Sequence, residues 1–548
     1  MTHPAGLSQE MADMVVQTLR QVARRDLPDA RVLKLDREDE FPHDLIRTLL
    51  SPEVGLHLIF LPEDVGGLGG GARDICRISE EMAAVDLGVA TAFLAICLGT
   101  DPILVGGTPE QKTRWLGRIA SEGLIVAYGV TEPAAGSNVA ALQTRAQPVR
   151  DASGAVESYR LNGTKQFITN GGVAQLYTIL AAAPGGPSFF IVERDTPGMS
   201  AGRHEDKHGI RASNTTSVQL DDVIVPADHL VGLAEGRGLK QANEVFGYTR
   251  LMVGAFGLGA GQNALERALA YARQRIQFGS PLIEKQGYAL KLLAPHWVDL
   301  AAGRAYVREI ALRIDSGERD LQVEGSIAKL WCTEAGNRAA DAALQALGGY
   351  GYTREYMVEK IRRDVRITSI YEGTSEIQQA IIGLYRWKET VRSKGAFWSG
   401  QAARLEDLHA RRPDVGAAQA AAAAQALGQT ILHCHQSGLT KHQIVQFQLA
   451  DLAAVVEVAG AFCRDAAQDG DEAAADAAMS RWFARRALAA ARRRGLEIVL
   501  GAVDPGDEAG VAAAGTFAAR VAAPDAWRSL VGGWRDLESV AAHLRARA

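Results

Sequence analysis

The sequence contains little cysteine, and none of it is arranged for bridging or for metal binding. Five Cys residues are spread over 548 positions, an odd total with no CxxC pair. Such a set argues against a disulfide framework and against a structural zinc site, because both need paired or clustered thiols. The pattern is typical of a protein kept in a reducing compartment, so we expect a cytoplasmic location and no bound metal.

Several motifs with known chemistry are also missing. The chain has no HExxH, no GxSxG, no Walker A phosphate loop and no EF-hand loop, which argues against the enzyme and binding classes that depend on them. Two glycine-rich stretches, residues 66–71 and 257–261, superficially suggest dinucleotide loops. The second lies inside a helical pattern, where small residues more often allow close helix packing. A nicotinamide-binding Rossmann domain is therefore not expected.

Charge and hydropathy exclude further classes. The net charge is −5, so no global basic field favours nucleic acid or an anionic membrane. The most apolar run, residues 87–99, is too short to span a bilayer and is typical of a buried helix. The N-terminal residues show no apolar stretch of a secretion signal. With 47% apolar and 22% charged residues, the composition is that of a soluble globular protein.

The hydrophobic period changes along the chain and predicts four domains. Residues 1–125 are mostly helical by pattern, whereas residues 126–240 carry short segments rich in Val, Ile and Thr that are typical of strands. These strands are expected to be antiparallel, because their connections are too short for helical crossovers. Long helical patterns return over residues 241–394, and residues 395–548 form an Ala-rich helical extension. The fold class is therefore α+β.

One short segment, IYEGTSEIQ at residues 370–378, places Glu372 between a Tyr and a Gly. By itself this Glu could cap a helix, bind a metal or act as a catalytic base. Thr374 or Ser375 would cap the following helix better. Two further motifs lie in the strand region, AYGVTEPAAGSNVAAL at residues 127–142 and KQFITNGG at residues 165–172. Taken alone, their polar residues could simply form turns.

Together these three segments resemble the acyl-CoA dehydrogenase family of flavoproteins. The resemblance continues in PEDVGGLG (62–69), KHGIRASNT (207–215), RQRIQFGSPLIEKQ (273–286) and ALGGYGYTREYMVEKIRRD (346–364), in the family's order. It covers roughly residues 15 to 390 and implies an N-terminal helical domain, a middle β domain and a C-terminal four-helix bundle. The extension resembles that of the very-long-chain branch, which implies a homodimer, with a tetramer as the alternative.

The resemblance implies FAD as the cofactor and assigns contact residues to it. Tyr128, Val130 and Thr131 would meet the pyrimidine end of the flavin, Phe167 would lie against the ring, and Thr169 would bond near flavin N5. Arg275, Gln277 and Phe278 match the segment that reaches the FAD of a neighbouring subunit, and Gln345, Gly348, Gly349, Thr374 and Glu376 would lie on the adenosine side. Ser137 and Arg250 match positions near CoA, while Tyr371 and Gly373 are expected to contact the substrate.

The implied reaction introduces an α,β double bond into an acyl-CoA thioester. Glu372 would remove the α-proton while the β-hydrogen leaves as hydride to the flavin, and electron-transfer flavoprotein would accept the electrons. Donors aimed at the thioester oxygen must stabilise the developing enolate. Gly373 would permit the tight turn that this requires, and burial against the substrate is expected to raise the pKa of Glu372.

Four positions depart from the family pattern. Asn138 replaces the usual Asp of a turn, and Gly247 replaces an acidic residue that helps to hold CoA in many relatives. Thr249 stands where some branches place their base, which leaves Glu372 as the candidate. Ala90 stands where glutaryl-type enzymes carry an Arg, which weakens a dicarboxyl-CoA substrate. The acyl chain itself is not predicted.

Two other functions stay open at this point. One is a DNA-associated flavoprotein of the same fold, although the net negative charge argues against it. The other is an acyl-CoA oxidase, because the choice of electron acceptor depends on oxygen access to the flavin. The basic segment 480–500 could contact a membrane surface peripherally or bind an acidic partner. A solvated arginine face is the simpler interpretation.

Overall fold

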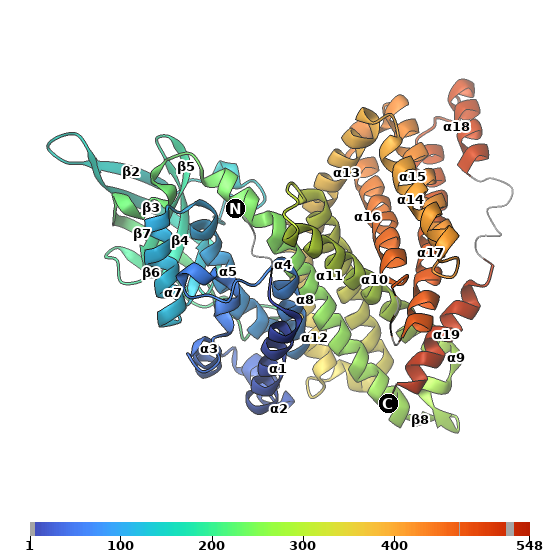
Figure 1. The fold of residues 1–548 in the computed structure, drawn as a ribbon, viewed down its shortest axis with the longest axis horizontal. Helices are drawn as coiled ribbons and strands as arrows, with labels where there is room; N and C mark the ends of the chain where they lie inside the picture. Colours follow the sequence, from blue (N-terminus) through green and yellow to red (C-terminus); the bar gives the residue numbers. More distant parts are fainter. Residues whose placement is uncertain (1–5, 469, 471, 522–530, 548) are drawn as a thin grey trace. The chain divides into compact units, whose positions relative to one another are not determined.

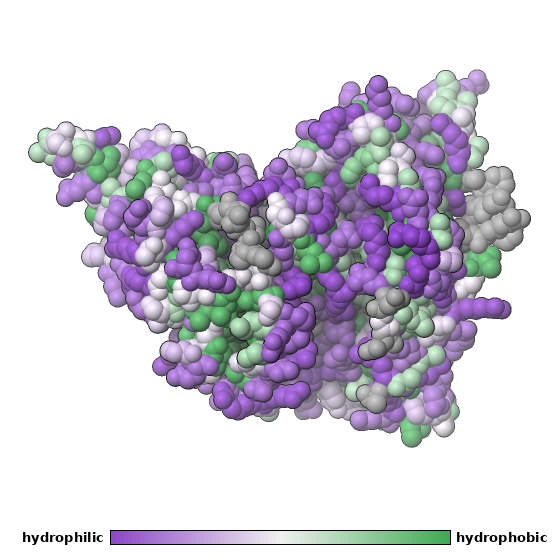
Figure 2. All heavy atoms as spheres, in the orientation of Figure 1, coloured by the Kyte–Doolittle hydropathy of each residue, from purple (hydrophilic) through white to green (hydrophobic). Residues whose placement is uncertain are grey.

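The computed structural model describes residues 6–468, 470, 472–521 and 531–547 of the chain (Figure 1). It divides into two compact units. The first unit contains residues 1–260, 311–322 and 354–368, and the second contains residues 261–310, 323–353 and 369–548. The predicted division into four domains is a separate matter from these two units and stays a prediction. Hydrophilic side chains cover most of the face shown in Figure 2, in keeping with the charged composition.

The first unit begins with helices. They are α1 (Gln9–Asp26), α2 (Asp29–Glu38), α3 (His43–Leu50), α4 (Ala72–Val85), α5 (Leu87–Gly106), and the short α6 (Pro109–Gln111) and α7 (Gly117–Glu122). Helix α5 is apolar around its whole circumference, and most of its residues are buried. Its 20 residues could cross a membrane by length and composition alone, but 83% of its apolar window is buried within the protein. The predicted buried helix is confirmed.

A seven-stranded sheet follows in the order β1-β4-β2-β3-β7-β6, with β5 paired to β4. The strands are β1 (Val126–Gly129), β2 (Arg145–Arg150), β3 (Val156–Thr169), β4 (Leu176–Ala183), β5 (Gly186–Glu193), β6 (Met199–Ala201) and β7 (Thr215–Pro226). Most pairs are antiparallel, as expected. However, β1 and β4 pair in parallel. Because β2 and β3 lie between them in the sequence, the chain runs in the direction of β1 again when it forms β4. Helix α5 packs against β1.

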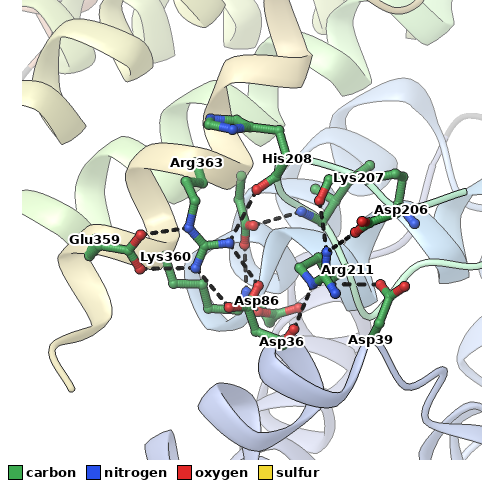
Figure 3. Close-up of polar contacts among 12 residues, drawn as sticks. Asp36, Asp39, Asp86, Asp206, Lys207, His208, Arg211, Glu359, Lys360 and Arg363 are labelled. Atoms are coloured by element: carbon green, nitrogen blue, oxygen red, sulfur yellow. Dashed lines mark hydrogen bonds and ion pairs between the residues drawn. The ribbon is translucent and has the colours of Figure 1, made fainter. Parts of the chain in front are cut away.

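A buried polar network joins distant parts of the first unit (Figure 3). Helix α12 (Met357–Val365) supplies Lys360, whose ammonium lies between the carboxylates of Asp86 and Asp364, with all three side chains at most 2% exposed. One turn along, Arg363 binds Asp36 on α2 at 2.7 Å. The backbone N–H of Ile210 also donates to Asp364 at 2.7 Å. The network therefore ties α12 to the N-terminal helices and to the loop before β7.

In the part that the structure describes, the second unit is helical apart from a small hairpin. Helix α8 (Gly238–Gln274) ends in it, and it also contains most of α10 (Ala294–Asp315) and α11 (Gln322–Leu347), all of α13 (Ser375–Arg392), and the short α9 (Gln286–Tyr288). The glycines of residues 257–261 allow close packing, as predicted. A Cβ atom at Gly261 would lie 3.0 Å from the Cα of Gly336 on α11. No nucleotide loop is formed there, because these glycines lie within α8.

Within its described residues, the extension adds six helices to the second unit. They are α14 (Ala396–Arg411), α15 (Ala417–Gln436), α16 (Gln443–Asp465), α17 (Ala473–Gly501), α18 (Glu508–Val521) and α19 (Gly533–Ala546). Helix α16 packs against α13, and α17 packs against α15, α16 and α19. A buried ion pair fixes the first contact, because Arg386 on α13 binds both carboxylate oxygens of Glu457 on α16 at 2.6 and 2.7 Å. The predicted helical extension is confirmed.

Candidate active site

The segment around Glu372 forms a tight turn in the second unit. Glu372 has a φ of 54° and Gly373 a φ of 86°, so two consecutive residues adopt a left-handed backbone conformation. Glycine adopts it freely, whereas for other L-residues it costs roughly 1–2 kcal/mol. Thr374 then caps α13, and its side chain accepts a hydrogen bond from the backbone N–H of Ile377. The capping role therefore belongs to Thr374, and Glu372 is not the cap of this helix.

Two fully buried side chains hold this turn. Lys329 on α11 is 0% exposed, and its Nζ donates a hydrogen bond of 2.7 Å to the carbonyl oxygen of Gly373. Gln378 is also 0% exposed, and its Nε2 donates to the carbonyl oxygens of Glu372 at 3.1 Å and Gly373 at 3.0 Å. Because these donors come from two helices, they fix the unusual backbone conformation and with it the position of Glu372.

The two motifs of the strand region come together in the first unit. The backbone N–H of Gln166 on β3 donates to the carbonyl oxygen of Thr131 at 2.9 Å. The neighbouring Lys165, fully buried, binds the carbonyl oxygen of Val130 at 3.2 Å and the Glu132 carboxylate at 2.6 Å. Burial lowers the pKa of Lys165 to about 8, and the Glu132 carboxylate opposes that shift. The loop after β1 is therefore fastened to the end of β3.

Phe167 is exposed where these motifs meet. It has a φ of 58°, and its side chain is 65% exposed although it is a large apolar group. Thr169 ends the same strand two residues later. An exposed aromatic ring beside the backbone carbonyls and hydroxyl of residues 130–131 can cover one face of a planar heterocycle and bond to its edge. The residues present thus fit the isoalloxazine ring of a flavin.

Three family models match the chain over most of its length. The N-terminal domain of acyl-CoA dehydrogenases matches residues 9–123, the middle domain residues 127–223, and the C-terminal domain residues 236–384 and 399–503. The chain belongs to the acyl-CoA dehydrogenase family. This membership confirms the predicted fold class and the predicted enzyme class, and with them FAD as the family's cofactor.

Curated relatives align with the core of this acyl-CoA dehydrogenase. An acyl-CoA dehydrogenase of Bacillus subtilis (strain 168) is 38% identical over 68% of this chain and 97% of its own length. The cyclohexane-1-carbonyl-CoA dehydrogenase of Geobacter metallireducens is 34% identical over 70% of this chain and 99% of its own. A solved acyl-CoA dehydrogenase from Bacillus anthracis, complexed with FAD, shares the fold over 100% of this chain and 97% of its own, with a TM-score of 0.82 and 23% identity. That fold includes the extension.

The residues expected to reach the FAD of a neighbouring subunit, and those expected on the adenosine side, lie in the second unit. Arg275, Gln277 and Phe278 belong to a hairpin of β8 (Ile276–Gln277) and β9 (Ser280–Pro281). Phe278 is 96% exposed, and the Arg275 guanidinium lies 5.9 Å from the ring centre of Tyr350. Gln345 lies near the end of α11, where Gly348 and Gly349 begin the turn that contains Tyr350, while Thr374 and Glu376 lie at the start of α13. The structure thus brings the hairpin close to the glycine turn.

The residues expected to contact CoA and the substrate differ in their exposure to solvent. Ser137 is exposed in the loop after β1, whereas Arg250 is 8% exposed within α8. Tyr128 on β1 stacks on Phe189 with ring centres 5.7 Å apart. Tyr371 precedes Glu372 in the clamped turn. The ligand roles of all these residues stay predictions. Among the described residues, no cluster of His, Cys, Asp or Glu could hold a metal ion.

Sequence reasoning missed Lys329, Gln378, Lys165 and Glu132. A signal existed for Lys329, because it is the only charged residue in the otherwise small and apolar helical segment GSIAKLWC. A buried cation needs hydrogen-bond partners, so such a position indicates a polar contact elsewhere in the chain. The partner itself, a backbone carbonyl 44 residues away, leaves no mark in the sequence.

Helix α17 contains the basic segment 480–500. The simpler interpretation held that its arginines are solvated, but some of them bind residues of other helices. Arg486 binds Asp299 on α10 at 2.7 Å, and Arg481 binds Asp536 on α19 at 2.9 Å. The basic face therefore takes part in packing the extension onto the helical bundle.

Proposed function

We propose that this acyl-CoA dehydrogenase introduces an α,β double bond into an acyl-CoA with Glu372 as the base, and passes the electrons from FAD to an electron-transfer flavoprotein. The observation that supports the base most directly is the clamped turn. It presents one carboxylate from a strained backbone position that Lys329 and Gln378 hold by three hydrogen bonds. Strain of this kind is typical of functional sites.

The carboxylate of Glu372 would take the α-proton of the thioester. The α-carbon is a weak acid, so the charge that develops on the thioester oxygen must meet fixed donors. We expect the backbone N–H of Glu372 to be one of them, since the turn that fixes the carboxylate also fixes this group. FAD, when bound, would accept the β-hydrogen as hydride. Thr131, Phe167 and their neighbours at residues 128–130 would hold the flavin ring.

Lys329 would support this step by holding the base in position. Its hydrogen bond to the carbonyl oxygen of Gly373 keeps the turn in place, so the Glu372 carboxylate stays where it can accept the proton. Orientation matters because a displacement of about 1 Å at a reacting group can cost roughly 100-fold in rate.

An anaerobic titration of the purified protein tests this function. Acyl-CoAs with short, long, branched, alicyclic, aromatic and dicarboxylic chains are added while the absorbance of the oxidised flavin is followed. The alicyclic member is included because one relative is named as a cyclohexane-1-carbonyl-CoA dehydrogenase. We expect bleaching by at least one chain class, and its loss in Glu372→Gln. The exposed Glu157→Gln is the matched control. An unreactive wild-type flavin, or an active Glu372→Gln protein, would refute the proposal.

The acceptor is tested separately, with the substrate that the titration identifies. We expect fast turnover with electron-transfer flavoprotein and a reduced flavin that persists in air. Rapid reoxidation by oxygen, with hydrogen peroxide as product, would indicate an oxidase instead.

We also propose a homodimer, because the exposed hairpin of residues 275–281 matches the family segment that reaches a neighbouring subunit. Phe278, at 96% exposure, is a large apolar group that a partner would cover.

A further inference from the structure

The hairpin of residues 275–281 is too small to hold its own position. Each of its strands has two residues, and an isolated two-stranded hairpin is marginally stable at best. Its large apolar side chains do not anchor it, because Ile276 is 61% exposed and Phe278 is 96% exposed. On one side, the Arg275 guanidinium lies near the ring of Tyr350. The position of the hairpin therefore depends on contacts that other parts of the second unit make with its base.

Helix α19, the last helix of the extension that the structure describes, lies beside the hairpin base (Figure 1). Before the hairpin, Arg273 near the end of α8 donates a hydrogen bond of 2.8 Å to the carbonyl oxygen of Leu544 on α19. After the hairpin, the Arg545 guanidinium donates to the carbonyl oxygen of Ile283 at 3.3 Å. Helix α19 thus contacts both the segment that enters the hairpin and the segment that leaves it.

The contact continues along the segment that follows the hairpin. Gln286 on α9 donates a hydrogen bond of 2.5 Å to the Glu538 carboxylate. The Arg547 guanidinium lies 4.8 Å from the ring centre of the buried Trp297 on α10. Helix α19 also packs against residues 289–293. Four of its apolar side chains are buried: Leu537, Val540, Ala541 and Leu544. Burial of these side chains anchors the helix, so its polar groups stay at the hairpin base.

We propose that α19 is a brace that holds the hairpin in the position from which it reaches the FAD of a neighbouring subunit. The reach to that FAD rests on the proposed function, whereas the brace itself rests on the contacts of α19. The helix lies beyond residue 503, where the match to the C-terminal family domain ends. The brace therefore belongs to the far end of the extension, which supports cofactor binding in the partner copy.

A matched pair of cavity variants tests the brace. Leu544→Ala removes a buried side chain of α19, and Leu405→Ala removes the same group from α14, which packs against α15. Both changes leave a cavity, so a general loss of stability is common to the two. We expect backbone hydrogen exchange of residues 276–285, measured by mass spectrometry on the flavin-containing protein, to rise about 10-fold in Leu544→Ala and to stay unchanged in Leu405→Ala. Equal exchange of these residues in the two variants overturns the proposal.

A second pair of variants tests the same contact without opening a cavity, in case Leu544→Ala does not fold. Arg273→Met removes the hydrogen bond to the Leu544 carbonyl oxygen. It is expected to raise the exchange of residues 276–285 about 2- to 10-fold, the effect of one hydrogen bond. Arg520→Met removes the same charge from an exposed position on α18 and should leave the exchange unchanged. An Arg273→Met protein with the wild-type exchange rate overturns the brace.

Release of FAD tests the consequence for the cofactor. Flavin fluorescence after dilution reports the FAD that each variant loses, and we expect Leu544→Ala to lose it about 10-fold more readily than Leu405→Ala. Phe278→Ser changes the hairpin directly and should also release FAD. If Phe278→Ser releases FAD but Leu544→Ala does not, the brace is overturned. If Phe278→Ser retains FAD, the reach of the hairpin under the proposed function fails, while hydrogen exchange still decides the brace.

Discussion

Replacing Lys329 by Met removes the ammonium group that holds the Gly373 carbonyl while keeping most of the side-chain volume. The lost contact is a buried charge-assisted hydrogen bond of 2.7 Å, worth about 1.5–3 kcal/mol. Part of this free energy holds Glu372 at a φ of 54°, a conformation that its neighbours must enforce. Without it the turn is expected to relax. We predict a fall in kcat of about 10- to 100-fold, since each 1.4 kcal/mol corresponds to a factor of ten.

The assay is steady-state turnover of the best acyl-CoA, with kcat and KM measured across pH. If the turn no longer holds the Glu372 carboxylate in the right orientation, kcat should fall by a larger factor than KM rises. Gln378→Met removes the donor to the carbonyls of Glu372 and Gly373, and Lys329 binds the second of these as well, so the double variant should cost less than the sum of the single ones. A Lys329→Met protein that keeps wild-type kcat would refute this account.

Three further predictions concern ion pairs and assembly. Arg386→Met takes the guanidinium away from the buried Glu457 carboxylate, so the free energy of unfolding in urea should fall by about 3–5 kcal/mol. A second change, Glu457→Met, should recover much of it. Burial raises the pKa of Asp36, but the hydrogen bonds from Arg363 and the positive charges of Arg363, Lys360 and Arg211 together outweigh it and lower the pKa below its ordinary 3.8. This carboxylate therefore stabilises the fold above that value, and the stability is lost as pH falls through the lowered pKa, a loss that acid titration should find smaller in Asp36→Asn. Phe278→Ser should shift light scattering from dimer toward monomer, while an unchanged dimer would place the subunit contact elsewhere.

The sequence by itself determined the fold class, the family and the location of the candidate catalytic segment. Local periodicity is enough to separate helices from strands, so the buried helix α5 and the helical extension were predictable. Short motifs identify the family because the residues of each motif are neighbours in the sequence. The cap at Thr374 was also predictable, since capping depends on the hydroxyl and the next three residues.

Only the tertiary structure decided which distant residues support these segments. Lys329 reaches the turn of Glu372 and Gly373 from another helix, and Arg486 binds Asp299, which lies 187 residues away in the chain. The parallel pairing of β1 with β4 likewise depends on two strands being inserted between them. Contacts of this kind arise when helices and strands pack, and no local pattern encodes their partners. The residues proposed to carry out the chemistry are therefore neighbours in the sequence, whereas the turn is held rigid by residues that are distant in the sequence and come close only when the chain folds.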